Sequence, residues 1–156
     1  VSSGTTLPVH ISLKPRGTLD LESPTLTTTY TSLISGVGTV VINSDPSHLG
    51  RVILTADNTY SGRTKVEHGS LEFTGDVSEL KGLLTLASDT FVDFESNLRE
   101  IFHGIISGQG SLFVNEFGGT GTLVLPRTNF YKGATTVHGG TLIFTGNVSR
   151  LLGGLT

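Results

Sequence analysis

The 156-residue chain carries 10 Lys and Arg against 13 Asp and Glu, a formal net charge of −3 at pH 7. The basic residues are scattered, so the charge gives no footprint for nucleic acid or an anionic membrane surface. No stretch approaches the roughly 18 apolar residues of a membrane span. The absence of Cys excludes disulfides, Cys-ligated zinc and thiol catalysis.

Short strands are predicted along the chain from one recurring phrase: Gly, then Thr, Ser or Arg, then apolar, any and apolar residues. This alternation of β-branched and aromatic residues indicates strands with one face buried. The leading Gly is expected to supply a positive φ for the turn before each strand. The phrase occurs at Gly17–Leu21, Gly38–Ile42, Gly50–Leu54, Gly69–Phe73, Thr90–Phe94 (without Gly), Gly110–Val114, Gly121–Leu125 and Gly140–Phe144.

No segment keeps an apolar period of 3.6 residues for ten residues or more. The nearest, Asn97–His103, corresponds to Thr25–Ser32, a poor helix sequence, so both are predicted to be extended. Most phrases start about 20 residues apart, which suits one coil of a parallel β-helix. Two spacings of 12 and 11 residues suit either two strands of one coil or a local hairpin. Six coils at roughly 4.8 Å each would form a rod about 30 Å long.

The second half of the chain repeats the first. Residues 51–80 align with residues 122–151, 71 positions later, and the flanking segments align with offsets of 72 and 73. A fixed period of this size indicates stacked units that are each too poor in core to fold alone. We therefore predict an all-β solenoid spanning residues 1–156, with two tandem units at approximately 11–83 and 84–154, and the start of a third at Leu155. Since the first residues include neither an initiator Met nor a signal peptide, the chain is expected to be a processed product or a fragment.

A long motif occurs once in each unit. The first copy contains Leu54, Asn58, Tyr60, Gly62, Thr64, Val66, Gly69 and Leu71, and the second contains Leu125, Asn129, Tyr131, Gly133, Thr135, Val137, Gly140 and Leu142. This motif resembles the passenger-associated transport repeat of autotransporter (type V secretion) passenger domains. The second copy departs from the pattern at Phe130, where Thr is favoured, and has Pro126 where the first copy has Thr55.

The resemblance implies a right-handed parallel β-helix on the surface of a Gram-negative bacterium, exported through the outer membrane. It implies a structural or adhesive segment that supports secretion and folding of the passenger, without catalysis and without a cofactor. The implied partners are a component of the host-cell surface or extracellular matrix, or a second copy. Nucleic acid binding is not expected, and neither is direct membrane insertion, since the barrel domain that such proteins use is absent from this segment.

Two alternatives remain open at this point. The segment could be a passive stalk that displays an effector domain lying elsewhere. It could also be a polysaccharide-acting β-helix enzyme, which would need a carboxylate groove with a basic residue. The sequence alone does not assemble such a groove.

Each motif copy contains a candidate turn. Asn58 and Asn129 precede Tyr60 and Tyr131, and a Gly closes each turn. Because Asn bonds readily to its own backbone, turn stabilisation is predicted for both. The tyrosines are expected to cover the turns with their hydroxyls in water, and stacking on carbohydrate is the alternative role.

The other chemically interesting residues have structural interpretations. The acids are expected to form a solvated face, with a Ca²⁺ site as the alternative. The histidines show no metal-ligand spacing and no Ser-His-acid set. Gly-rich stretches at 36–38, 108–110 and 118–121 open no helix and are predicted to be turns rather than phosphate loops. The acids are Asp20, Glu22, Asp89, Asp93 and Glu95, and the histidines are His10, His48, His68, His103 and His138.

Overall fold

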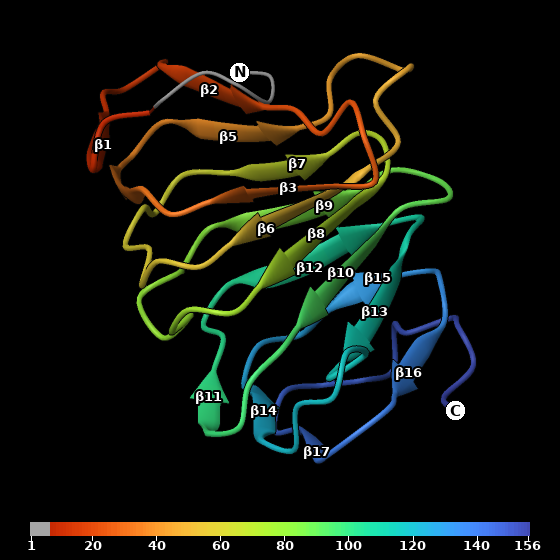
Figure 1. Cartoon of the computed structure of the whole chain (residues 1–156). Helices are drawn as coiled ribbons and strands as arrows, with labels where there is room; N and C mark the ends of the chain where they lie inside the picture. The colour runs from red at the N-terminus through yellow and green to blue at the C-terminus, as the bar shows by residue number, and fades with distance from the viewer. Residues whose placement is uncertain (1–6) are drawn as a thin grey trace.

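The computed structural model describes residues 7–156, which form a parallel β-helix of six stacked coils (Figure 1). Each coil passes through three faces, and every strand pairing among these residues is parallel. The predicted all-β solenoid is therefore confirmed. Within the described residues, no helix is long and apolar enough to cross a membrane.

Two faces are continuous six-stranded sheets. Face 1 contains β2 (Thr18–Leu21), β5 (Thr39–Ile42), β7 (Thr64–Val66), β9 (Leu83–Leu86), β12 (Ile105–Gly108) and β15 (Phe130–Tyr131). Face 2 contains β3 (Thr27–Tyr30), β6 (Arg51–Leu54), β8 (Ser70–Phe73), β10 (Phe91–Phe94), β13 (Ser111–Val114) and β16 (Thr135–Val137).

Face 3 is interrupted in its middle. It begins with β1 (His10–Leu13) and β4 (Leu33–Gly36) and ends with β11 (Arg99–Ile101), β14 (Thr122–Leu125) and β17 (Thr141–Phe144). Between these two sheets, the turn segments 58–61 and 77–80 occupy the face. The first turn stacks on β4, since the amides of Thr59 and Ser61 donate to the carbonyls of Ile34 and Gly36 at 2.9 and 2.8 Å.

Every phrase predicted from alternation forms a strand. The segments predicted to be extended contain β3 and β11, which confirms that neither is helical. The short spacing between the Gly38 and Gly50 phrases corresponds to β5 and β6, on successive faces of one coil. The hairpin alternative is therefore wrong, because hairpin strands would pair antiparallel.

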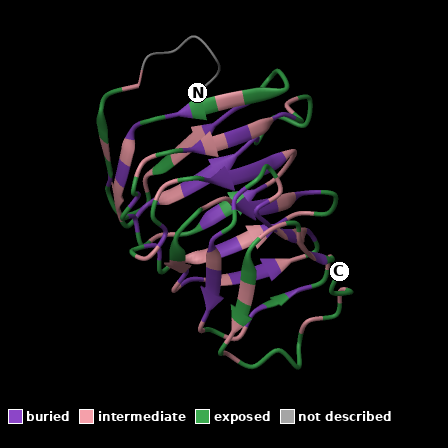
Figure 2. Cartoon of the chain, turned by 60° about the horizontal axis from the view of Figure 1, so that its bottom comes forward, coloured by how far each residue is buried: buried purple, intermediate pink, exposed green. Residues whose placement is uncertain are grey.

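The core is a column of inward side chains stacked in register from coil to coil. On face 1, Leu21 aligns with Ile42, and Ile42 with Val66. On face 2, Leu54 aligns with Phe73, and Phe73 with Phe94, whose ring lies 5.4 Å away. Burying each such side chain contributes about 1.5–3 kcal/mol, and Figure 2 shows the buried positions recurring along the strands.

The expected reason for the leading glycines is correct at only two of the phrases. Gly69 and Gly140 have φ of 62° and 67°, whereas the other leading glycines do not have positive φ. At Gly38, Gly50, Gly110 and Gly121 the backbone of the preceding coil lies too close for a side chain. A Cβ on Gly50 would lie 1.8 Å from the carbonyl oxygen of Thr25.

Candidate functional site: the repeat turns and the corner groove

Each repeat turn is fixed by a buried Asn. The Oδ1 atom of Asn58 accepts from the backbone amide of Ile34 at 2.8 Å, and its Nδ2 atom donates to the carbonyl of Ala56 at 2.9 Å. Asn129 makes the equivalent bonds to Ile106 and Arg127, at 2.7 and 3.0 Å. The side chain therefore closes its own turn, as predicted, and also ties that turn to the strand of the preceding coil.

The tyrosines of the motif point inward, which corrects the prediction of wet hydroxyls. Tyr60 and Tyr131 are 2% and 1% exposed. Their hydroxyls lie 2.7 and 2.6 Å from the Oγ1 atoms of Thr64 and Thr135. Burial raises the pKa of each tyrosine to about 12. Neither ring offers a face for stacking on carbohydrate, because each fills the core beneath its turn.

Gly62 and Gly133 are required by close approach rather than by a positive φ. A Cβ on Gly62 would lie 1.8 Å from the carbonyl oxygen of Gly38, and one on Gly133 would lie 2.4 Å from that of Gly110. These glycines therefore allow one coil to pack directly against the next.

The remaining motif positions belong to the core or to strand starts. Leu54, Thr64, Val66 and Leu71 are buried, as are Leu125 and Thr135, whereas Val137 and Leu142 are half-buried. Together the motif positions hold coils together and present no reactive group to solvent.

A second pair of buried asparagines, missed in the sequence, fixes the corners after β5 and β13. Asn43 has φ of 51°, accepts from the Ser23 amide at 2.6 Å, and donates to the carbonyl of Gly50 at 2.8 Å. Asn115, 72 positions later, has φ of 57° and accepts from the Ser96 amide at 2.9 Å. The available signal was the identity of both residues at equivalent positions directly after a strand, since Asn tolerates this conformation well.

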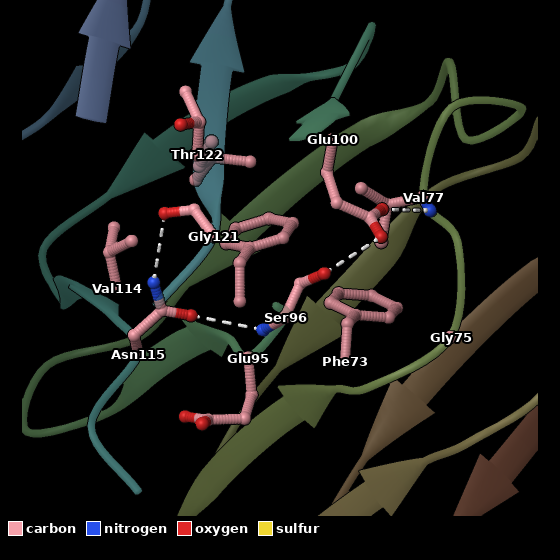
Figure 3. A pocket seen from close by; sticks show the side chains of 12 residues that line it. Phe73, Gly75, Val77, Glu95, Ser96, Glu100, Val114, Asn115, Gly121 and Thr122 are labelled. Carbon is pink, nitrogen blue, oxygen red and sulfur yellow. Dashed lines mark hydrogen bonds between the residues drawn. The ribbon is translucent and has the colours of Figure 1, made fainter. Parts of the chain in front are cut away.

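A narrow pocket lies beside Asn115, at the corner between faces 2 and 3 (Figure 3). Its walls include Phe73 and Phe94 together with Ser96 and Glu100. The Glu100 carboxylate accepts from the Ser96 hydroxyl at 3.1 Å and from the Val77 amide at 3.0 Å. At about 10 Å³, the pocket has room for one water molecule at most.

A wider surface groove of about 640 Å³ runs along the same corner. It is lined by four carboxylates, with hydroxyl and amide side chains between them, and by no Lys or Arg. Three of the carboxylates accept hydrogen bonds from backbone amides of a neighbouring coil: Asp57 from the amide of Asp76, Glu100 from that of Val77, and Glu95 from that of Phe117. These three acids therefore hold backbone loops in place.

Asp93 corrects the prediction that the acids form a solvated face. It is 0% exposed on the outer side of β10, and Glu22 is also buried, whereas Asp89 is exposed. No described residue makes a well-formed hydrogen bond to either carboxylate oxygen of Asp93. Burial, followed by the nearby charge of Glu95, raises the pKa of Asp93 to about 7, against a weaker lowering by the Glu116 amide.

The surroundings of Asp93 form an outer cluster on face 2, consisting of Arg51, Glu72, Asp93, Phe113 and Phe117. The Arg51 guanidinium lies 2.9 Å from Glu72 and 3.9 Å from the centre of the Phe117 ring. Asp93 is in register with Glu72 and Phe113 on the neighbouring strands. The loop after β13 thus folds back over the outside of the sheet.

Two histidines pair with acids, His138 near this outer cluster and His48 at the corner between faces 1 and 2. His138 lies 2.5 Å from Glu116, and His48 lies 2.7 Å from Glu22. Burial tends to raise the pKa of Glu22, but bonds from His48 and Ser44 outweigh it and lower that pKa. Among residues 7–156, no group of three or more His, Cys, Asp or Glu side chains is arranged to hold a metal ion.

Comparison with known proteins identifies the repeats. Residues 49–73 and 118–147 match the family described as passenger-associated-transport-repeat. A 59-residue stretch, 38% of the chain, is 42% identical to the adhesin BmaC autotransporter of Brucella suis biovar 1 (strain 1330). The match covers 2% of that adhesin's length, and no solved structure matches the chain. The chain therefore carries two stretches that match the passenger-associated-transport-repeat family, and over part of its length it is similar to an autotransporter adhesin.

Proposed function

We propose that this segment is a structural and adhesive part of a bacterial autotransporter passenger, exposed at the cell surface or released after export through the outer membrane. The observation that carries the proposal is that both matched repeats lie within the stacked coils of one parallel β-helix. The adhesin relative supports it, although only a small part of that protein is represented.

The coil-by-coil construction suits a chain that folds as it leaves a pore. Each coil contacts its neighbours through parallel pairings, so a folded coil can template the next without distant segments. The chain has no Cys, so no disulfide can form before export and obstruct threading.

The surface features favour a rod over a polysaccharide-acting enzyme. The corner groove lacks a Lys or Arg beside its carboxylates, and three of these acids hold backbone amides. We propose a component of the host-cell surface or extracellular matrix, or a second copy of the rod, as the partner. The alternative is a passive stalk for an effector elsewhere in the protein.

The proposal is tested by sedimentation equilibrium of the segment over a range of concentrations. A matched version carries polar capping coils at both ends, because an open terminal coil can pair with other chains. Self-association that survives capping supports an adhesive lateral surface. Association that disappears on capping, together with no binding to immobilised matrix proteins, would favour the passive stalk.

A further inference from the structure

Equivalent strands of the two repeats lie on different faces of the rod. β2 and β5 are on face 1, whereas their counterparts 73 and 72 residues later, β10 and β13, are on face 2. β6, on face 2, corresponds to β14, on face 3. Every equivalent pair of strands is displaced in this way, by one face in the direction in which the chain winds.

Counting faces along one unit gives the size of the displacement. From β1 the chain returns to face 3 at β4, at the turn 58–61 and at the turn 77–80, which is three full circuits. It then reaches β9, the counterpart of β1, on face 1. One repeat is therefore ten faces long, or three coils and one third.

The tyrosine turns show the same displacement with identical local contacts. The Tyr60 turn lies on face 3, where Thr59 bonds to Ile34 of β4. The Tyr131 turn forms β15 on face 1, paired with β12. Since both tyrosines are buried and bonded to a Thr four residues later, the motif works equally well on either face.

We infer that a rod built from this repeat turns each successive unit by one third of a circuit, so that its repeated surface elements point in three directions in rotation. The same element returns to a given face only after three units, which is ten coils or about 48 Å. A straight partner that lies along one face would therefore contact the same surface element only once in every three units. The arrangement instead fits neighbouring copies of the rod on three sides, and this choice of partner rests on the proposed function.

The repeat leaves one apolar side chain exposed at equivalent positions, which makes the rotation measurable. Leu26, at the corner between faces 1 and 2, is 91% exposed, and Leu98, at the corner between faces 2 and 3, is 72% exposed. Since the chain has no Cys, a pair of spin labels can be attached at these positions through Leu26→Cys and Leu98→Cys. The control pair is Leu26→Cys with Ser88→Cys. Ser88 lies at the same corner as Leu26, between faces 1 and 2, three coils further along the rod.

Electron–electron distance measurements on the two doubly labelled proteins test the rotation. The control pair should be about 14 Å apart along the rod, and the repeat-equivalent pair about 20 Å apart, because it also crosses one strand. Equal distances would overturn the inference. Should either labelled protein fail to fold, Thr59→Cys with Phe130→Cys gives a second repeat-equivalent pair in exposed turn positions.

The partner is tested separately, by sedimentation of capped rods carrying Leu26→Asp, Leu98→Asp or both. Contacts on several sides predict a partial loss of association in each single variant and a larger loss in the double variant. Complete loss in one single variant, or no effect in the double, would overturn the three-sided arrangement. A capped rod that stays monomeric refutes self-association itself, and the distance measurement still decides the rotation.

Discussion

At the scale of single residues, one side-chain amide supplies a hydrogen bond that a regular strand would otherwise make. Ile34 lies in β4, and the coil next to it is a turn at this point rather than a strand. The Asn58 Oδ1 atom accepts from the Ile34 amide in place of a backbone carbonyl. Because an unpaired buried amide is costly, the position selects Asn in both repeats.

Asn58→Ala should lower the free energy of unfolding by about 1–3 kcal/mol, because the Ile34 amide is left buried without an acceptor. Asn129→Ala should cost a similar amount through Ile106. Urea denaturation measures both changes. The control is Asn147→Ala, since Asn147 is exposed and bonds only within its own turn, to the Ser149 amide. Equal stability of the Asn58 and Asn147 variants would contradict the assigned role.

The buried hydroxyl pair of each repeat can be tested by a double-mutant cycle. Tyr60→Phe should cost about 1 kcal/mol and leave the Thr64 hydroxyl unpaired. Thr64→Val should have a similar cost, and the double variant should lose less than the sum of the two. Strictly additive losses would show that the 2.7 Å contact between the hydroxyls contributes nothing.

At the scale of the elements, contact between neighbouring coils is set by glycines in the turns. Gly62→Ala should cost about 3 kcal/mol, at the upper end of overpacking effects, because the new methyl group meets the backbone of Gly38. Gly154→Ala is the matched control, since a Cβ there has no neighbour within 4 Å. Thermal melting distinguishes them, and unchanged melting of the Gly62 variant would disprove the close packing of these coils.

The outer cluster gives the β-helix a pH dependence of known sign. The pKa of Asp93 in the folded chain is about 7, above its ordinary value of 3.8, so the folded state holds the proton more tightly than the unfolded state. The resulting stability is fully present below about pH 3.8 and is lost as the pH rises through 7. Between pH 5 and pH 8, the free energy of unfolding should therefore fall more in the natural chain than in Asp93→Asn.

The control for this effect is Asp89→Asn, because Asp89 is exposed and its left-handed conformation suits Asn. This variant should follow the pH profile of the natural chain. An Asp93→Asn profile that parallels the natural one would show that Asp93 titrates normally.

Local patterns in the sequence were enough to predict the strands and the stacking, because a β-helix repeats one short pattern of alternation. They could not predict which polar residues are buried. Asp93 follows the same alternation as a solvated residue, but it lies between Glu72 and Phe113 on the neighbouring strands, and the loop after β13 brings the Glu116 amide beside it. The prediction for Tyr60 was also wrong, because the inward direction of its side chain depends on a partner, Thr64, across the turn.

At the scale of the whole molecule, the contribution of a core side chain to stability depends on the coils that lie on both sides of it. Phe73 and Phe144 hold equivalent positions in the two repeats. Phe73 is 3% exposed and aligned between Leu54 and Phe94. Phe144 is half-buried and pairs with Leu125 on one side, with no strand on its other side among the described residues.

Phe73→Ala should therefore lower the free energy of unfolding by about 3–5 kcal/mol, the usual cost of truncating a buried Phe. Phe144→Ala should cost clearly less, because less apolar surface is lost and no closed cavity forms. In a longer chain, with a further coil stacked on β17, the cost at Phe144 should rise toward that at Phe73. Urea denaturation of the two variants in both chain lengths measures this, and a cost at Phe144 that ignores the added coil would contradict nearest-neighbour stabilisation of the rod.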